Sequence, residues 1–103
     1  WSLPFRDRLQ RLFIEGQLAL AGWLGERERN AEAAEACHRV LARDPLREEA
    51  WRRLMTSHAR TGERAQALRL YQQLSDLLRV ELDAEPDQAT AALQQRLLAG
   101  DTV

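Results

Sequence analysis

The chain contains no lysine, and it is poor in cysteine, proline and aromatic side chains. Alternating runs of Val, Ile and Thr, which are typical of β-strands, are absent, so the sequence excludes a sheet-based fold. No apolar run approaches the roughly 20 residues needed to cross a bilayer, and we expect no membrane partner. The single cysteine, Cys37, has no partner for an internal disulfide, which favours a reducing, cytoplasmic setting.

The charged residues almost balance one another. Fifteen arginines oppose 16 acidic residues, which gives a formal net charge of -1. No net positive field therefore attracts nucleic acid, and we expect DNA to be reached only through a domain outside this chain. A length of 103 residues fits one domain. Because the chain opens at Trp1 inside a segment with helical periodicity, we expect residues 1–103 to be a piece of a longer protein.

Helical periodicity dominates what the sequence does contain. Apolar residues recur at three- and four-residue spacing in five segments, at about 4–24, 31–43, 45–61, 63–82 and 88–99. Asn30, Asp44 and Asp87 are predicted N-caps, since each side chain can accept a bond from an unpaired helical N–H. Pro45 would take the first helical position, and Gly62 would close that helix. Antiparallel packing of such helices predicts an all-α fold.

Two predictions concern large apolar side chains. Trp51 is expected in the core of the third helix, so that its replacement by alanine would cost about 3–5 kcal/mol. If the chain is cut from a longer protein, Trp1, Phe5 and Trp23 are expected to form an exposed patch for a domain or dimer contact. The predicted inward stripe of the first helix comprises Phe5, Leu9, Leu12, Phe13, Gly16, Leu20, Trp23 and Leu24.

The chain also repeats itself with a period of 34 residues, which resembles the tetratricopeptide repeat. That resemblance implies a right-handed stack of antiparallel helical hairpins, with about five helices. The superposed pairs are Leu20 with Leu54, Ala21 with Met55, Ala33 with Ala67, Cys37 with Tyr71, and Val40 with Leu74.

Three segments together resemble the bacterial transcriptional activator domain of the Streptomyces antibiotic regulatory protein type of regulator. They are Leu41–Met55, Gly62–Tyr71 and Glu81–Pro86, and the resemblance extends from about Phe5 to Leu98. It implies a regulatory interaction domain beside a separate winged-helix DNA-binding domain. Such a domain mediates dimerisation and contacts with partner proteins, which are adjacent domains or the transcription machinery.

The side chains that carry chemistry are scattered. No phosphate-binding loop, nucleophile elbow or zinc signature occurs, so we expect no enzyme activity, no metal and no cofactor. Cys37 and His38 project about 100° apart on a helix, which is a poor geometry for sharing a metal ion. Cys37 is expected to be a small core residue, and His58 lacks a partner for catalysis.

Binding is the more credible role, in the concave groove that the tetratricopeptide resemblance implies. Its lining in the second repeat would include Glu49, Arg52, Thr56 and Arg60, with Glu15 as a counterpart in the first repeat. Arg52 and Arg60 would suit an acidic partner segment. Four alternatives stay open: ordinary exposed helix charges, a generic tetratricopeptide adaptor that binds a peptide, a small-molecule sensor with its ligand between the first and third helices, and an arginine-rich middle that lies against DNA phosphates bound by a neighbouring domain.

Overall fold

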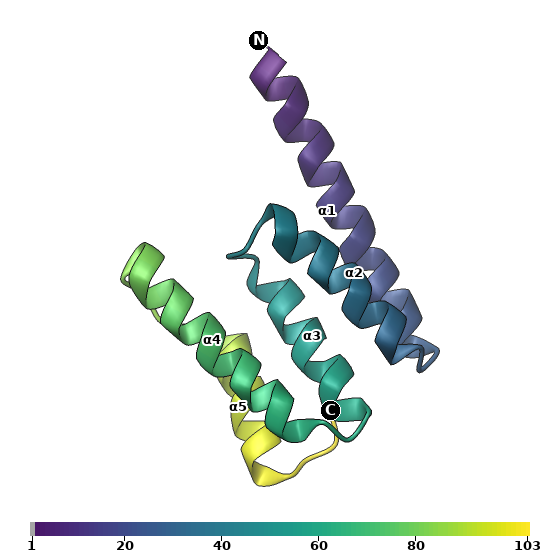
Figure 1. Ribbon diagram of the computed structural model, residues 1–103, viewed down its shortest axis with the longest axis vertical. Helices are drawn as coiled ribbons and strands as arrows, with labels where there is room; N and C mark the ends of the chain where they lie inside the picture. The colour runs from purple at the N-terminus through teal and green to yellow at the C-terminus, as the bar shows by residue number, and fades with distance from the viewer. Residues whose placement is uncertain (1) are drawn as a thin grey trace.

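Five α-helices form nearly all of the chain that the structure describes. The computed structural model describes the backbone of residues 2–103 and the side chains from Pro4 onward, and the predicted patch residue Trp1 lies outside both. The helices are α1 (Ser2–Glu26), α2 (Asn30–Arg43), α3 (Glu48–Arg60), α4 (Arg64–Leu82) and α5 (Gln88–Ala99) (Figure 1). Residues 2–103 contain no strand, and the all-α prediction is confirmed.

Each of the first four helices packs antiparallel against the next one, and α5 contacts both α4 and α3 (Figure 1). This is a stack of helical hairpins of the tetratricopeptide type, only 18 Å thick along its shortest axis. Among the described residues, no helix is both long and apolar enough to cross a membrane. The largest fully buried side chains are Leu54, Met55, Leu74, Leu97, Val40, Thr90 and Cys37.

The 34-residue period is visible in the core. Equivalent positions are buried in both hairpins at three of the predicted pairs: Ala21 with Met55, Ala33 with Ala67, and Val40 with Leu74. The pair Leu20 and Leu54 breaks the equivalence, because Leu20 is 37% exposed and Leu54 only 1%. The repeat therefore holds best where consecutive helices touch, and worst on the outer side of α1.

The start of α3 differs from the prediction. Asp44 does not cap α3; its backbone N–H instead closes α2 on the Val40 carbonyl, at 2.8 Å. The Arg47 N–H then donates to the Asp44 carbonyl, so residues 44–47 form a turn with Pro45 at its second position. Trp51 donates its indole N–H to the Pro45 carbonyl at 2.8 Å and is only partly buried. An Asp-Pro pair suits a turn as well as a helix start, which is why helix α3 begins three residues later than predicted.

The other predicted boundaries give mixed results. Asp87 caps α5 as expected, since its carboxylate accepts the Thr90 backbone N–H at 2.9 Å. Gly62 follows α3 with φ +83°, the left-handed conformation that a helix end requires. Asn30 was wrongly predicted as the α2 cap, because it is already the first helical residue and its Oδ1 atom has no hydrogen-bond partner.

The apolar stripe predicted to face inward from α1 is wrong for most of its members. α1 buries the opposite side, where Ile14 and Leu18 pack with Val40 of α2 and Ala50 of α3. The remaining buried residues of α1 are Ala21 and Leu24. Of the predicted stripe, only Leu24 is buried, and Phe13 is partly buried. Both sides of α1 are apolar, and the sequence pattern does not say which of them α2 covers.

α1 also projects beyond the rest of the stack (Figure 1). It has 25 residues and α2 only 14, so α1 exceeds its partner by about three turns.

Candidate functional site

A groove lies between the carboxyl-terminal half of α1 and one side of α3. Its cavity volume is about 840 Å³, and the start of α4 and residues 101–103 close its far end. Gly22 and Gly25 form part of the α1 wall, where a side chain would approach the guanidinium of Arg53 or Arg60. The cations in the lining are Arg52, Arg53, Arg60 and Arg64, and the anions are Glu26, Glu28 and Asp101.

Two of these arginines bind backbone carbonyls, those of Gly25 and Leu97 lying at helix ends. Arg60 donates from Nη1 to the Gly25 carbonyl at 3.3 Å and from Nε to the Val103 carbonyl at 3.0 Å. Arg64 donates to the Leu97 carbonyl, in the last turn of α5, at 2.7 Å. A cation at a helix carboxyl terminus is favourable because that end of the helix dipole is negative. Both guanidinium groups therefore connect elements that are far apart in the sequence.

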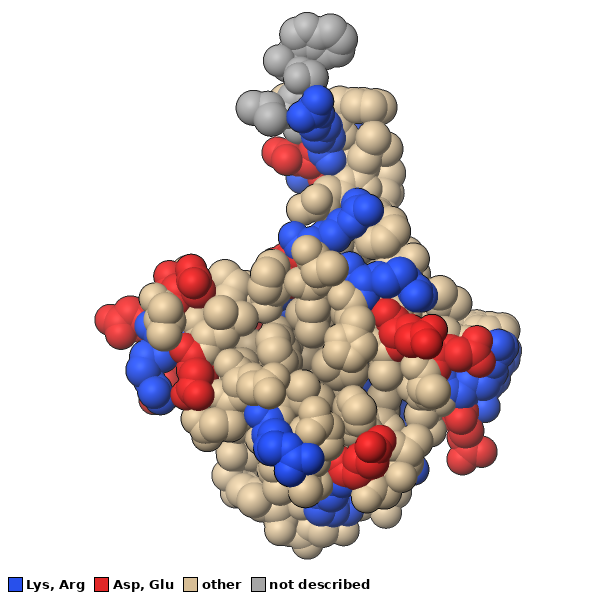
Figure 2. Space-filling model, viewed as in Figure 1, with Lys and Arg blue, Asp and Glu red and all other residues tan. Residues whose placement is uncertain are grey.

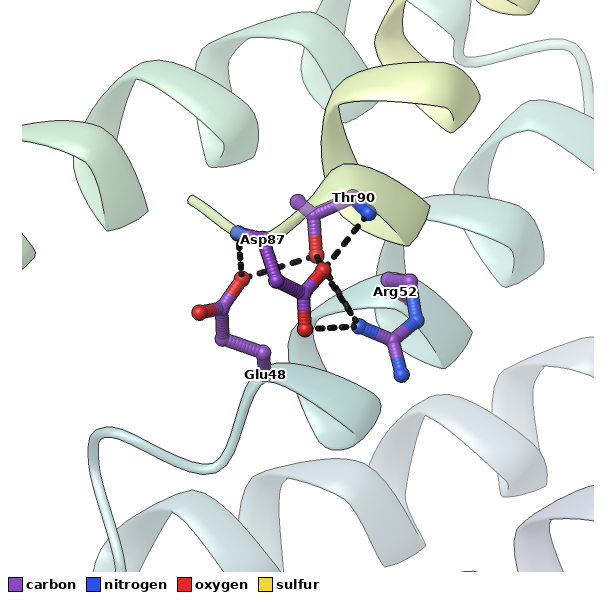
Figure 3. A network of polar contacts seen from close by, with 4 residues as sticks. All are labelled: Glu48, Arg52, Asp87 and Thr90. Atoms are coloured by element: carbon purple, nitrogen blue, oxygen red, sulfur yellow. Dashed lines mark hydrogen bonds and ion pairs between the residues drawn. The ribbon is translucent and has the colours of Figure 1, made fainter. Parts of the chain in front are cut away.

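Arg52 belongs to a polar network that joins α3 to α5 (Figure 3). It lies 3.2 Å from each carboxylate oxygen of Asp87 and donates to the Thr90 hydroxyl at 3.0 Å. Glu48 accepts both the Asp87 backbone N–H and the Thr90 hydroxyl, each at 2.9 Å. Two carboxylates thus face the amino-terminal end of α5, where the helix dipole is positive. The pKa of Asp87 is lowered, first by the Thr90 backbone N–H, with further contributions from the Thr90 hydroxyl and from Arg52.

The structure brings three of the five predicted site residues into one groove. Arg52, Thr56 and Arg60 line it. Glu49 does not; it pairs with Arg53 one turn along α3 at 3.3 Å. Glu15 lies exposed on α1, away from the lining. The binding role of all five stays a prediction, and what sequence reasoning missed is that Arg52 and Arg60 already bind groups of this chain.

A second, smaller pocket of about 340 Å³ lies between α2 and the turn after α3. His38 and His58 both line it, and the His58 ring nitrogen Nδ1 is 3.1 Å from a Glu63 carboxylate oxygen. The same oxygen accepts the Thr61 hydroxyl at 2.9 Å. The bond from His58 is the main reason that the pKa of Glu63 is lowered, and the bond from Thr61 adds to it. Among the residues described, no group of three His, Cys, Asp or Glu side chains is arranged to hold a metal.

Cys37 is fully buried in the main core, as expected for a small apolar residue. Burial raises the pKa of its thiol to about 11, so the thiolate that reacts with electrophiles hardly forms at neutral pH.

The surface charges do not form one field. On the face drawn in Figure 2, blue and red patches are interspersed, and a broad uncharged area lies near the middle of the face. This distribution fits the net charge of -1 and gives no continuous basic track for a nucleic-acid backbone on that face.

The most unusual surface of the molecule is the uncovered side of α1. We define the outer stripe as Phe5, Leu9, Leu12, Gly16, Ala19 and Trp23, all of which are exposed. Phe5, Leu9 and Leu12 are each more than half exposed, and Trp23 is 45% exposed. Arg27 stacks on the Trp23 ring at 3.8 Å from its centroid, so a guanidinium borders one end of the stripe. The structure thus places Phe5 and Trp23, two members of the predicted exposed patch, on one helix face.

The fold and these surfaces define a helical-repeat scaffold with an apolar helix face and an arginine-lined groove. The sequence profile of the bacterial transcriptional activator domain matches residues 1–98, and the chain belongs to that family. Over 72 residues the chain is 39% identical to the Regulatory protein AfsR of Streptomyces griseus. That match covers 70% of this chain but only 7% of the relative's length. No solved structure gives a significant match.

Proposed function

We propose that this domain serves a transcriptional activator by mediating dimerisation and contacts with partner proteins, beside a separate winged-helix DNA-binding domain. Family membership supports the regulatory role, and the relative AfsR is itself named a regulatory protein. The outer stripe of α1 is the observation that carries the proposal. Monomeric proteins seldom expose a contiguous apolar patch of more than a few hundred Å² without using it for an interaction.

The size of the stripe fits a weak self-association. Scaled by their exposed fractions, its aromatic and leucine side chains present roughly 500 Å² of apolar surface per copy. If the whole stripe is covered, two copies would remove about 1,000 Å² from water, which is the threshold for a weak biological interface and below the area of stable ones. We therefore expect a dimer that dissociates in the micromolar range, and that brings two attached DNA-binding domains together at a promoter.

The groove contributes less to the proposed function. Arg52, Arg60 and Arg64 each bind a carboxylate or carbonyl of this chain, so an incoming acidic segment would first have to displace those groups. Residues 101–103 also run along the groove, where Val103 packs against the main core. These contacts favour a structural role for the arginines over a peptide-binding one.

Sedimentation equilibrium of the chain over a micromolar concentration range tests the proposal. The wild-type chain should sediment as a monomer–dimer mixture, and Leu12→Glu should sediment as a monomer because it buries a charge in the interface. Val80→Glu is the matched control, since Val80 is 79% exposed on α4, away from the stripe. A wild-type chain that stays monomeric throughout, or a Val80→Glu chain that loses the dimer equally, would refute the proposal.

A reporter assay connects self-association to DNA binding. The chain is fused to a DNA-binding domain that occupies its operator only as a dimer, and operator occupancy is measured in bacteria. The wild-type fusion should occupy the operator, and the Leu12→Glu fusion should not, at equal expression and equal helical circular dichroism. Equal occupancy by both fusions would show that the stripe does not bring the fused domains together.

A further inference from the structure

We propose that the outer stripe of α1 pairs with the outer stripe of a second copy, and that the two helices run antiparallel. Phe5 then faces Trp23 of the second copy, Leu9 faces Ala19, and Leu12 faces Gly16. The inference rests on the proposed self-association, and adds to it the surface, the orientation and the register. The pairing is symmetric, because each contact occurs twice about a two-fold axis near the middle of the stripe.

The spacing of the stripe is the first observation behind this pairing. Its six positions are separated alternately by four and three residues, from Phe5 to Trp23. This is the spacing of the a and d positions of a two-stranded coiled coil, which keeps one seam facing a partner helix. The stripe is about 27 Å long at 1.5 Å per residue, long enough for six layers of side chains.

The sizes of the side chains are the second observation. Large residues stand at Phe5, Leu9, Leu12 and Trp23, and small ones at Gly16 and Ala19. In an antiparallel pair, each small residue meets a leucine, and the two aromatic ends meet each other. In a parallel pair, glycine would meet glycine and alanine would meet alanine, which leaves two adjacent layers unfilled. Unfilled layers cost stability because their lining atoms lose dispersion contacts.

The surroundings of the small residues allow the close approach. A Cβ built on Gly16 would meet nothing within 4 Å, so a leucine of a second copy has room there. The stripe also lies on the side of α1 opposite to the residues that contact α2 and α3, including Ile14 and Leu18. A second copy can therefore dock along α1 without displacing the existing hairpin.

The same pattern distinguishes a second copy from another occupant. A neighbouring domain of different sequence could cover an apolar stripe of any composition. In a stripe that pairs with itself, by contrast, each large residue needs a small residue at the position that faces it. Along this stripe Leu9 faces Ala19, and Leu12 faces Gly16.

Disulfide trapping tests the register. Chains with Leu9→Cys and chains with Ala19→Cys are oxidised separately and as an equimolar mixture. The antiparallel register predicts that cross-linked dimer forms at least tenfold faster in the mixture. In either chain alone, the two cysteines would be about 15 Å apart along the helix axis, beyond the reach of a disulfide. Native Cys37 does not interfere, because it is fully buried in the core.

The outcomes separate this inference from the proposed function. Rapid cross-linking of the Leu9→Cys chain alone would show a parallel pair and overturn the register. A dimer in sedimentation that cross-links in none of these combinations would place the interface elsewhere and overturn the surface. If the wild-type chain is monomeric, self-association itself fails, and a neighbouring domain becomes the occupant of the stripe.

A glycine substitution gives an independent readout. Gly16→Leu should raise the dimer dissociation constant at least tenfold, because the new leucine would meet Leu12 of the second copy in an already filled layer. In a parallel pair the same substitution would fill the glycine layer and tighten the dimer. Leucine is a better helix former than glycine, so lost helicity would not explain a weaker dimer. Gln73→Leu, at an exposed position of α4, is the control for an added apolar side chain.

Discussion

Replacing Thr90 by valine should weaken the attachment of α5 to α3. Thr90 is fully buried, and its hydroxyl accepts from Arg52 at 3.0 Å while lying 2.9 Å from carboxylate oxygens of both Glu48 and Asp87. A hydroxyl has one proton, so it donates to one carboxylate at a time and accepts from the guanidinium. Valine keeps the shape and removes these bonds.

The expected loss follows from the charge of the partners. Hydrogen bonds to charged groups contribute about 1.5–3 kcal/mol, and the surviving Arg52–Asp87 ion pair is partly exposed and adds little. We expect Thr90→Val to lower the free energy of unfolding by about 2 kcal/mol. The midpoint of thermal unfolding should fall by roughly 10 °C for a domain of this size.

Urea unfolding followed by circular dichroism measures the loss, and amide hydrogen exchange in α5 locates it. Thr90→Ser is the matched control, because it keeps the hydroxyl and loses one methyl group, at a cost of about 1 kcal/mol. If Thr90→Val is within about 0.5 kcal/mol of the wild type, or no more destabilising than Thr90→Ser, the network does not hold α5 in place.

Four further outcomes are expected. Because the pKa of Asp87 is lowered, its contribution to stability is fully present above the ordinary aspartate pKa and is lost as the pH falls through the lowered value; acid titration of unfolding should show this loss in the wild type and not in Asp87→Asn. Cys37, whose pKa is raised to about 11 by burial, should react with a thiol reagent at pH 8 only after denaturation. Gly62→Ala should destabilise the domain by about 1 kcal/mol in thermal unfolding, because φ is +83° there. Trp51→Ala should cost about 2 kcal/mol in urea, less than the 3–5 kcal/mol of a fully buried tryptophan, since Trp51 is only partly buried.

The elements that the sequence predicts well are those with one dominant local signal. Asp87 after Pro86 gives an N-cap with no competing assignment, and the cap is present as predicted. Gly62 ends α3 for a similarly local reason, its positive φ. Asp44 and Pro45 suit either a helix start or a turn; the turn forms here, and the Asp44 carboxylate pairs with Arg47 Nε instead of accepting an N–H of α3.

Features that depend on distant residues were beyond prediction from local sequence. Arg52 and Asp87 are 35 positions apart, so nothing near Arg52 indicates that its guanidinium is already paired. The sequence pattern favours the larger side chains, Phe5 and Leu12 among them, for the inward side of α1, yet Ile14 and Leu18 are the residues that fit against α2 and α3. A helix with two apolar sides gives two equally valid patterns, and only the shape of its neighbours decides between them.

If α1 pairs with a second copy as proposed, the projecting part of α1 links the order of one segment to assembly. Its turns from Pro4 to about Leu12 have exposed side chains only and no neighbouring helix of the described chain against which to pack. These turns continue a helix that is packed from Ile14 onward, but they have no tertiary support of their own, so they should fray more when the protein is diluted and less when a partner lies along them. The helix content measured at increasing protein concentration would then report the fraction of chains whose α1 is paired. The amino-terminal turns of α1 would thus become ordered as the dimer forms.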